Sequence, residues 1–244
     1  MSLNHLISIR DLTREEAILI LDTAEQMAAT QSHGVKKLPT LQGKTVVNLF
    51  FEDSTRTRIS FETAMTDLGG HAQFYGPGTI QLGGHESIED SGRVMGSLVD
   101  ILMARVDRHK DVVNLAKYAA CPVINGMSEY NHPTQELGDL LTMIENLPEG
   151  KNIEDCKVAF IGDATQVCVS LMFIASKMGM DFVQFGPKGH QVTDGGLQVD
   201  TDIDLVAIAE ENCKVSGGTV TISDDIECIK GADFIYTDVW YGLY

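Results

Sequence analysis

Short apolar runs alternate along this chain with longer segments in which apolar residues recur every three or four positions. The run at 45–51 has the length and composition of a buried strand, and the helical spacing from Ile59 to Leu68 predicts a helix after it. The same alternation continues along the chain, which predicts an α/β protein with doubly wound parallel sheets. Strands are predicted at 45–51, 71–75, 100–105, 122–125, 157–162, 181–186, 219–223 and 232–239, and helices at 14–28, 54–68, 87–98, 111–119, 136–146, 165–178, 203–211 and 226–230.

A turn-like segment, Leu-Pro-Glu-Gly-Lys at 147–151, divides the alternation into two series. We therefore expect two domains, 1–147 and 148–244, each built on its own parallel sheet. No run approaches about 18 consecutive apolar residues, so no membrane span is predicted. The first residues of the chain also lack the apolar core of a signal peptide. These features favour a cytoplasmic protein.

The charge of the chain limits its partners. With 18 basic and 35 acidic residues the net charge is −17, and no cluster of Lys and Arg stands out. Such a protein repels nucleic acid and anionic membranes, so neither is an expected partner. All seven arginines precede residue 109, which assigns guanidinium-based anion chemistry to the first half of the chain. The five cysteines and seven histidines lack the spacing of a metal site, so no metal or other cofactor is predicted.

The segment Ser54-Thr55-Arg56-Thr57-Arg58 lies where the first predicted strand gives way to a helix. The first turn of a helix exposes unpaired backbone N–H groups and the positive end of the helix dipole. Hydroxyl groups and a guanidinium added to that turn suit an oxygen-rich dianion such as a phosphate. The same residues also fit a plain helix cap at Ser54 with solvated arginines beside it.

Three further strand ends carry polar residues. Arg105 ends one predicted strand, His132 and Gln135 follow another, and Asp238 ends the last. Ligands of open α/β sheets bind at the carboxyl ends of the strands, so these residues are candidates for a site. The alternatives are an exposed strand-end charge for Arg105, a structural role for His132 and an exposed turn acid for Asp238.

The predicted strand at 71–75 is followed by a loop with four glycines, residues 76–85, which contains Gln81 and His85. Its length and composition favour a loop that covers a ligand or reaches a neighbouring subunit. A plain surface linker is the alternative.

The order of these motifs resembles that of the aspartate/ornithine carbamoyltransferase family. The resemblance covers essentially the whole chain, and the combination of motifs is specific. From about Ala64 onward the chain resembles the branch of the family that uses putrescine, whereas residues 1 to about 62 resemble the branch that uses aspartate. The segments that carry the resemblance are 54–58, Arg105, 132–135, 80–86, 127–133 and 238–244.

The resemblance implies carbamoyl phosphate and a small amine as substrates, and a catalytic homotrimer with active sites shared between subunits. Residues 54–58 are then expected to bind the phosphate, and Gln135 the carbamoyl amide. Relatives often carry lysine at the position of His85, so no role is assigned to it. Thr57, Arg105 and His132 are expected to polarise the carbonyl oxygen, and Arg56 to contact the phosphate. Gln81 is expected to complete the site of a neighbouring subunit. Asp238 and Tyr241 are expected to bind the acceptor.

The acceptor expected from the resemblance is putrescine, with the reaction reversible towards carbamoyl phosphate. Ornithine and aspartate remain alternatives, and a non-catalytic carbamoyl-phosphate binder or assembly subunit is an alternative of another class. Relatives continue beyond the position of Tyr244 into a His-Cys-Leu-Pro segment and closing helices. By this resemblance the second domain is expected to be truncated at its C-terminus, and the chain alone to turn over little.

Overall fold

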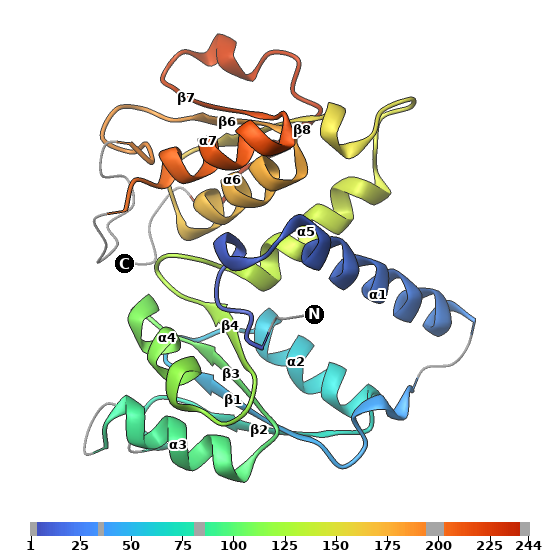
Figure 1. Ribbon diagram of the computed structural model, residues 1–244, viewed down its shortest axis with the longest axis vertical. Coiled ribbons are helices and arrows are strands. Elements are labelled where there is room, and N and C mark those ends of the chain that lie inside the picture. Colours follow the sequence, from blue (N-terminus) through green and yellow to red (C-terminus); the bar gives the residue numbers. More distant parts are fainter. Residues whose placement is uncertain (1–3, 34–36, 81–85, 194–202, 240–244) are drawn as a thin grey trace. The chain divides into compact units, whose positions relative to one another are not determined.

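The structure is a computed structural model that describes residues 4–33, 37–80, 86–193 and 203–239. Its contacts divide the chain into two units (Figure 1). Unit 1 comprises Met1–Ile7 and Glu15–Ser128, and unit 2 comprises Ser8–Arg14 and Glu129–Tyr244. In the described part of the chain no helix is long and apolar enough to cross a membrane.

Unit 1 contains a sheet of four parallel strands in the order β2-β1-β3-β4. Apolar residues fill the central strands because a parallel sheet is covered on both faces. Val47 and Leu49 of β1 point to one face and Val46 and Phe50 to the other, as the two-residue period of a strand requires. The strands are β1 (Thr45–Phe50), β2 (His71–Tyr75), β3 (Ile101–Arg105) and β4 (Val123–Met127).

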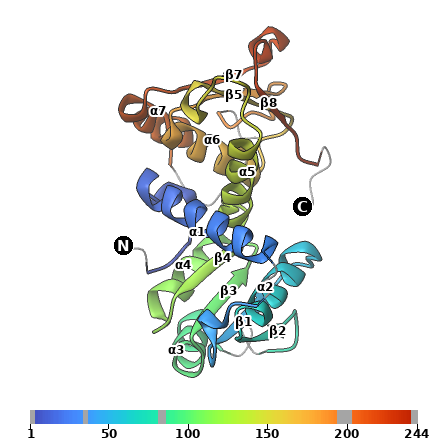
Figure 2. The same ribbon diagram turned by 90° about the vertical axis from the view of Figure 1, so that its right-hand side faces the viewer.

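Helices cover both faces of this sheet (Figures 1 and 2). Val112 and Leu115 of α4 and Ile88 of α3 pack on the face that carries Val47, and Met65 of α2 packs on the opposite face. Ser87 caps α3 by accepting a hydrogen bond from the backbone N–H of Asp90. The helices of unit 1 are α1 (Arg14–Ser32, whose first residue belongs to unit 2), α2 (Arg56–Asp67), α3 (Ile88–Leu98) and α4 (His109–Tyr118), with a 3-10 turn η2 (Pro39–Leu41).

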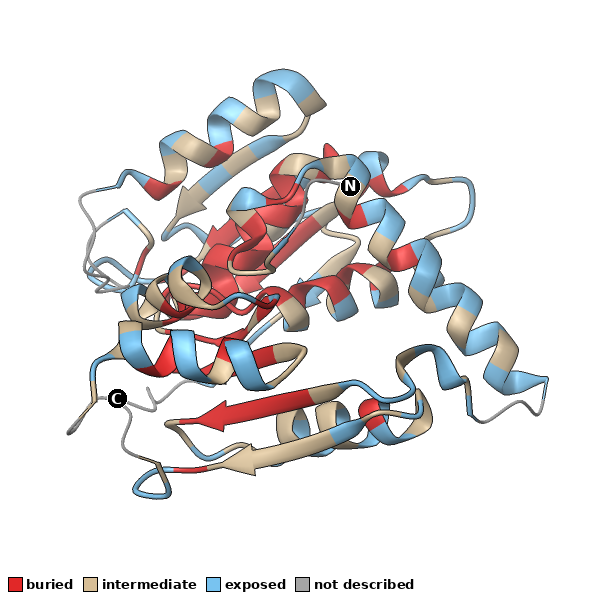
Figure 3. Ribbon diagram, turned by 60° about the horizontal axis from the view of Figure 1, so that its bottom comes forward, coloured by how far each residue is buried: buried red, intermediate tan, exposed pale blue. Residues whose placement is uncertain are grey.

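Unit 2 contains a second parallel sheet, in the order β7-β6-β5-β8. Its central helix α6 (Gln166–Met178) has twelve of thirteen residues buried, and buried residues gather in the interior of each unit (Figure 3). α7 packs beside α6 against the sheet. The other elements are α5 (Pro133–Glu145), α7 (Leu205–Ser216), β5 (Lys157–Ile161), β6 (Asp181–Phe185), β7 (Thr219–Ser223), β8 (Phe234–Tyr236), and the 3-10 turns η1 (Ile9–Asp11), η3 (Ile153–Asp155) and η4 (Ile226–Ile229).

Two parallel sheets with interleaved helices confirm the predicted fold class. Some predicted boundaries are wrong. The predicted start of α5 at residue 136 is three residues late, because Pro133 occupies the first helical position, where a missing N–H costs nothing. The last strand spans three residues instead of the predicted eight. After Tyr236 the carbonyl of Ile161 accepts a hydrogen bond from the hydroxyl of Thr237 and not from a backbone N–H, so the ladder ends there.

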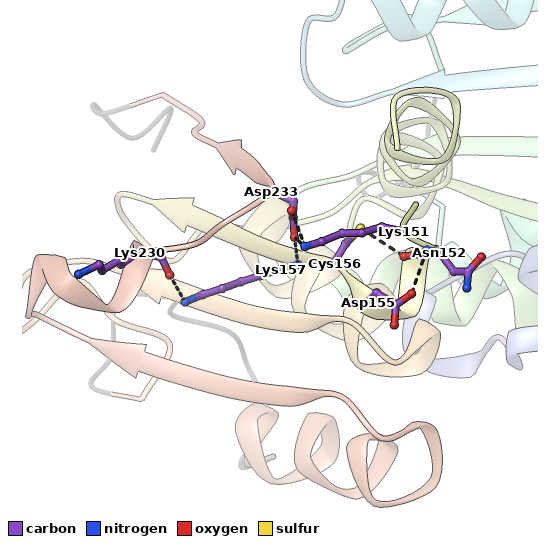
Figure 4. Close-up of polar contacts among 7 residues, drawn as sticks. All are labelled: Lys151, Asn152, Asp155, Cys156, Lys157, Lys230 and Asp233. Carbon is purple, nitrogen blue, oxygen red and sulfur yellow. Dashed lines mark hydrogen bonds and ion pairs between the residues drawn. The ribbon is translucent and has the colours of Figure 1, made fainter. Parts of the chain in front are cut away.

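A polar cluster around Asp233 fastens the start of β5 to the segment that leads into β8 (Figure 4). The Asp233 carboxylate accepts hydrogen bonds from Lys151 Nζ at 2.6 and 2.7 Å and from the Lys157 backbone N at 2.9 Å. The hydrogen bond from Lys151 is the largest cause that lowers the pKa of Asp233. The Lys157 side chain donates to the carbonyls of Cys228 and Lys230 at 2.7 and 2.9 Å, which holds the turn before β8.

We expect Asp233→Ala to lower the unfolding temperature by roughly 2–8 °C, because the variant leaves the N–H of Lys157 without its acceptor. Asp224→Ala is the matched control, since Asp224 is exposed and lies 3.6 Å from an exposed Lys188. Exposed ion pairs contribute little, so this variant should unfold within about 1 °C of the parent. Thermal unfolding by circular dichroism measures both, and equal shifts would contradict the role given to Asp233.

Candidate functional site

Residues 54–57 of unit 1, called the turn at 54–57 below, comprise the last two residues of the loop after β1 and the first two residues of α2. The helix begins at Arg56, and its N-cap is Thr55, whose side chain makes no capping hydrogen bond. The interpretation of Ser54 as the helix cap is therefore wrong. Within the described ranges, the side chains of residues 54–57 make no hydrogen bond or ion pair. Three hydroxyls and one guanidinium thus remain available at a helix N-terminus, which is the arrangement that binds oxyanions.

Arg58 differs from its neighbour Arg56. Its Nε donates to Glu62 Oε1 at 2.9 Å, and its guanidinium carbon lies 3.4 Å from the centre of the Phe74 ring. An ion pair one helical turn along and a cation–π contact hold this side chain against its own helix and β2. Arg56 is exposed, so it is the guanidinium of this turn that a ligand can engage without displacing a contact.

Arg105 ends β3, and the register places it opposite Phe50, the last residue of β1. The residue is only 8% exposed, and its Nη2 lies 3.7 Å from Glu52 Oε2. The alternative of an exposed strand-end charge is therefore wrong. Unit 1 brings Arg105 to the same edge of the sheet from which the chain continues into residues 54–57.

Unit 2 carries His132 and Gln135 at the start of α5. His132 is the N-cap residue, is 8% exposed, and donates its backbone N–H to Ser170 Oγ at 2.9 Å. Gln135 lies on the first turn and is exposed. Its Nε2 donates to both carboxylate oxygens of Asp139, at 3.0 and 3.1 Å. The two predicted residues therefore share one helix start, and Asp139, a residue that the sequence analysis did not select, holds Gln135.

Asp238 follows β8 at the carboxyl edge of the sheet of unit 2. Its Oδ2 accepts a hydrogen bond from Thr165 Oγ1 at 3.2 Å, and its Oδ1 accepts one from the backbone of Val239 at 2.8 Å. Thr165 is the N-cap of α6. The carboxylate is half-buried and fixed by these bonds, which distinguishes it from a loose acid of an exposed turn.

Glu136 is a second residue of this region that sequence reasoning missed. Its side chain is fully buried, and among the described residues neither carboxyl oxygen has a hydrogen-bond partner. Burial raises the pKa of Glu136 well above its usual range, and the charges of Asp139 and Asp238 raise it further. The surroundings therefore favour the neutral form of this carboxyl.

Gln81, His85 and Tyr241 lie outside the described residues. Where side chains are described, no group of His, Cys, Asp and Glu has the arrangement of a metal site.

Comparison with known families decides what kind of protein carries these features. Residues 4–145 match the family model described as "Aspartate/ornithine carbamoyltransferase, carbamoyl-P binding domain", and residues 154–244 match "Aspartate/ornithine carbamoyltransferase, Asp/Orn binding domain". The chain belongs to the aspartate/ornithine carbamoyltransferase family. The resemblance of the sequence to this family is thereby confirmed.

Individual carbamoyltransferases are similar over almost the whole chain. A putrescine carbamoyltransferase of Mycoplasma capricolum subsp. capricolum is 44% identical, covering 97% of this chain and 64% of that protein. An ornithine carbamoyltransferase of Pyrococcus horikoshii is 42% identical, covering 98% of this chain and 71% of that protein. The solved structure of ornithine carbamoyltransferase from Pyrococcus furiosus superposes with a TM-score of 0.87 at 42% identity, covering 97% of this chain and 72% of that one. The chain thus spans 64% of the length of the first relative.

The buried carboxyl of Glu136 predicts how the stability of the protein depends on pH. Because its folded-state pKa is raised, the stability that the neutral carboxyl contributes is complete below the ordinary value of 4.5 and is lost as pH rises through the folded-state pKa. Glu136→Gln removes this ionisation. We expect the unfolding free energy of the variant, relative to the parent, to rise with pH above about 4.5, by at most about 1.4 kcal/mol per pH unit.

Urea unfolding at several pH values between about 4 and 8 measures this difference. Glu145→Gln is the matched control, because it makes the same carboxylate-to-amide change at an exposed position of the same helix. A difference between Glu136→Gln and the parent that stays constant with pH would show that Glu136 titrates normally.

Proposed function

We propose that the chain takes part in the transfer of a carbamoyl group from carbamoyl phosphate to an amine. The observation that supports it is the turn at 54–57, where three hydroxyls, an unengaged guanidinium and a helix N-terminus lie together. A phosphate dianion matches each of these groups: the backbone N–H donors, the helix dipole and the bidentate geometry of Arg56. Arg58 adds positive charge to the same turn while it stays bound to Glu62 and Phe74.

The proposed reaction forms a carbon–nitrogen bond and breaks the carbon–oxygen bond to the phosphate. The neutral amine nitrogen attacks the carbamoyl carbon, and negative charge develops on the carbonyl oxygen. The phosphate then leaves with the electron pair of the carbon–oxygen bond and takes up the proton that the amine nitrogen loses. Donors that are already placed for the developing charge contribute about 10²–10³ in rate each. We assign this role to Thr57, Arg105 and His132, and we assign Gln135 to the carbamoyl amide.

The acceptor is proposed to be putrescine. The chain has no arginine after Arg108 that would pair with an acceptor carboxylate, whereas Asp238 supplies a fixed carboxylate for a distal ammonium. An acceptor without a carboxylate leaves the least unpaired charge. Tyr241 is assigned to the same acceptor. A similar protein is named as a putrescine carbamoyltransferase, while several others are named as ornithine carbamoyltransferases, so ornithine is the second candidate.

Assembly and setting complete the proposal. We propose a cytoplasmic homotrimer in which Gln81 of one subunit contributes to the site of the next, and a reaction that also runs towards carbamoyl phosphate. These assignments rest on the resemblance to the family and need no cofactor.

The phosphate assignment predicts that Arg56→Ala weakens carbamoyl phosphate binding by roughly 10–100-fold, because charge-assisted hydrogen bonds to the dianion are lost. Calorimetric titration of the 244-residue chain measures the affinity. Arg93→Ala is the matched control, since Arg93 is an exposed guanidinium of unit 1 that pairs with Asp90 at 3.0 Å. An unchanged affinity in Arg56→Ala would falsify the phosphate assignment.

The acceptor assignment predicts a ranking. With carbamoyl phosphate present, putrescine should raise the unfolding temperature of the chain more than ornithine, and ornithine more than aspartate, because each added carboxylate meets unpaired negative charge. Product formation with the same three amines is the second measurement. A larger shift or rate with ornithine than with putrescine favours the second candidate. Binding of carbamoyl phosphate without any response to an amine favours the non-catalytic binder.

A further inference from the structure

Asp139 of α5 links two residues that are far apart in the sequence. Both of its carboxylate oxygens lie within 3.1 Å of Gln135 Nε2. Its Oδ2 also accepts a hydrogen bond from the hydroxyl of Tyr236, at 2.8 Å, across 97 positions of the chain. All three residues belong to unit 2. Asp139 therefore joins the first turn of α5 to the last residue of β8.

This contact determines which end of the Gln135 amide faces outward. Burial raises the pKa of Asp139, and the hydrogen bonds from Tyr236 and Gln135 act in the opposite direction because they favour the ionised carboxylate. An ionised carboxylate only accepts hydrogen bonds, so the amide nitrogen of Gln135 faces Asp139 and the amide oxygen faces away. Tyr236 strengthens the constraint, because burial raises the pKa of its hydroxyl and the carboxyls of Glu136 and Asp139 raise it further. The phenol therefore stays protonated and donates to Asp139. Since Gln135 is exposed, its oxygen is left as an outward-facing acceptor.

We propose that Asp139 is a positioning residue that presents the Gln135 carbonyl oxygen to the NH₂ group of carbamoyl phosphate, and so makes the site prefer a carbamoyl over an acyl phosphate. The proposal rests on the proposed function and adds a determinant of specificity to it. The NH₂ group is what separates carbamoyl phosphate from acetyl phosphate, which has a methyl group in its place. A site that offers an acceptor at that point gains a hydrogen bond with the first ligand only.

The experiment compares the affinities of carbamoyl phosphate and acetyl phosphate by calorimetry, on the 244-residue chain. We call the ratio of the two affinities the carbamoyl preference. One hydrogen bond predicts a carbamoyl preference of about 5–10-fold for the parent chain. Gln135→Leu should reduce it to about 1, and Glu145→Gln, an exposed carboxylate-to-amide change on the same helix, should leave it unchanged.

Asp139→Asn should also reduce the carbamoyl preference to about 1. Asparagine has one side-chain oxygen where aspartate has two. When that oxygen accepts the hydrogen bond from the hydroxyl of Tyr236, the NH₂ group of the asparagine replaces the other oxygen and faces Gln135. The Gln135 amide then turns its oxygen inward and presents its own NH₂ group to the ligand. Adding Tyr236→Phe to Asp139→Asn removes the competing donor, lets the introduced asparagine turn its oxygen towards Gln135, and should restore the preference. A merely structural link between α5 and β8 predicts instead that the preference stays at about 1 in the double variant, because Tyr236→Phe removes one more contact of that link.

The outcomes separate the inference from the function on which it rests. If the parent binds neither ligand, the proposed function and this inference both fail. If the parent binds with a carbamoyl preference that Gln135→Leu abolishes but Asp139→Asn retains, the proposed function stands and the role of Asp139 is refuted. The same holds if Asp139→Asn loses the preference and the double variant does not regain it.

A measurement on the parent chain covers the case in which Asp139→Asn does not fold. Nuclear magnetic resonance reports the exchange of side-chain NH₂ protons with water, and hydrogen bonds to Asp139 should slow this exchange for Gln135 relative to Gln26, an exposed glutamine of α1. Equal exchange rates for the two glutamines would overturn the proposal.

Discussion

Parallel pairing of the strands is the constraint on which every candidate site in this chain depends. In unit 1 the register of β1 with β3 places Phe50 opposite Arg105, so the turn at 54–57 and Arg105 share one edge. In unit 2 the pairing of β5 with β8 brings the segments after both strands together, and the Thr165 hydroxyl reaches Asp238. Segments that are 50 or more residues apart meet because each parallel strand ends at the same edge as its neighbours.

The sequence was sufficient for the features that depend on local patterns. Alternating strand and helix signals predicted both sheets, and the helix predicted at 87–98 corresponds to α3, whose N-cap is Ser87. Local signals failed where contacts with another part of the fold determine where an element begins or ends. The first turn of α5 was missed because the helix was predicted to begin at residue 136, three residues after the proline that starts it. β8 was predicted too long because its end depends on the ladder with β5, which stops at Tyr236.

The polar contacts of the site were predictable only in part. Asp139 lies four positions after Gln135 on a predicted helix, a spacing that places both on one face, so this contact could have been inferred. The hydrogen bond from Tyr236 could not, because it depends on how β8 lies beside α5. The burial of Glu136 was equally hidden, since a carboxylate on the first turn of a helix is ordinarily a solvated partner of the helix dipole.

The distribution of charge along the chain agrees with both parts of the proposed function, phosphate binding and acceptor binding. Guanidinium groups occur only in the first half of the chain, and the phosphate assignment uses them there. The carboxyl edge of unit 2 instead gathers Glu136, Asp139 and Asp238, and the pKa of Glu136 is raised in part by the charges of the other two. A carboxylate brought to this edge by an acceptor would add to that repulsion, whereas an ammonium would reduce it. The same repulsion that disfavours ionisation of Glu136 therefore favours an acceptor that carries ammonium groups alone, which is the physical basis for proposing putrescine ahead of ornithine.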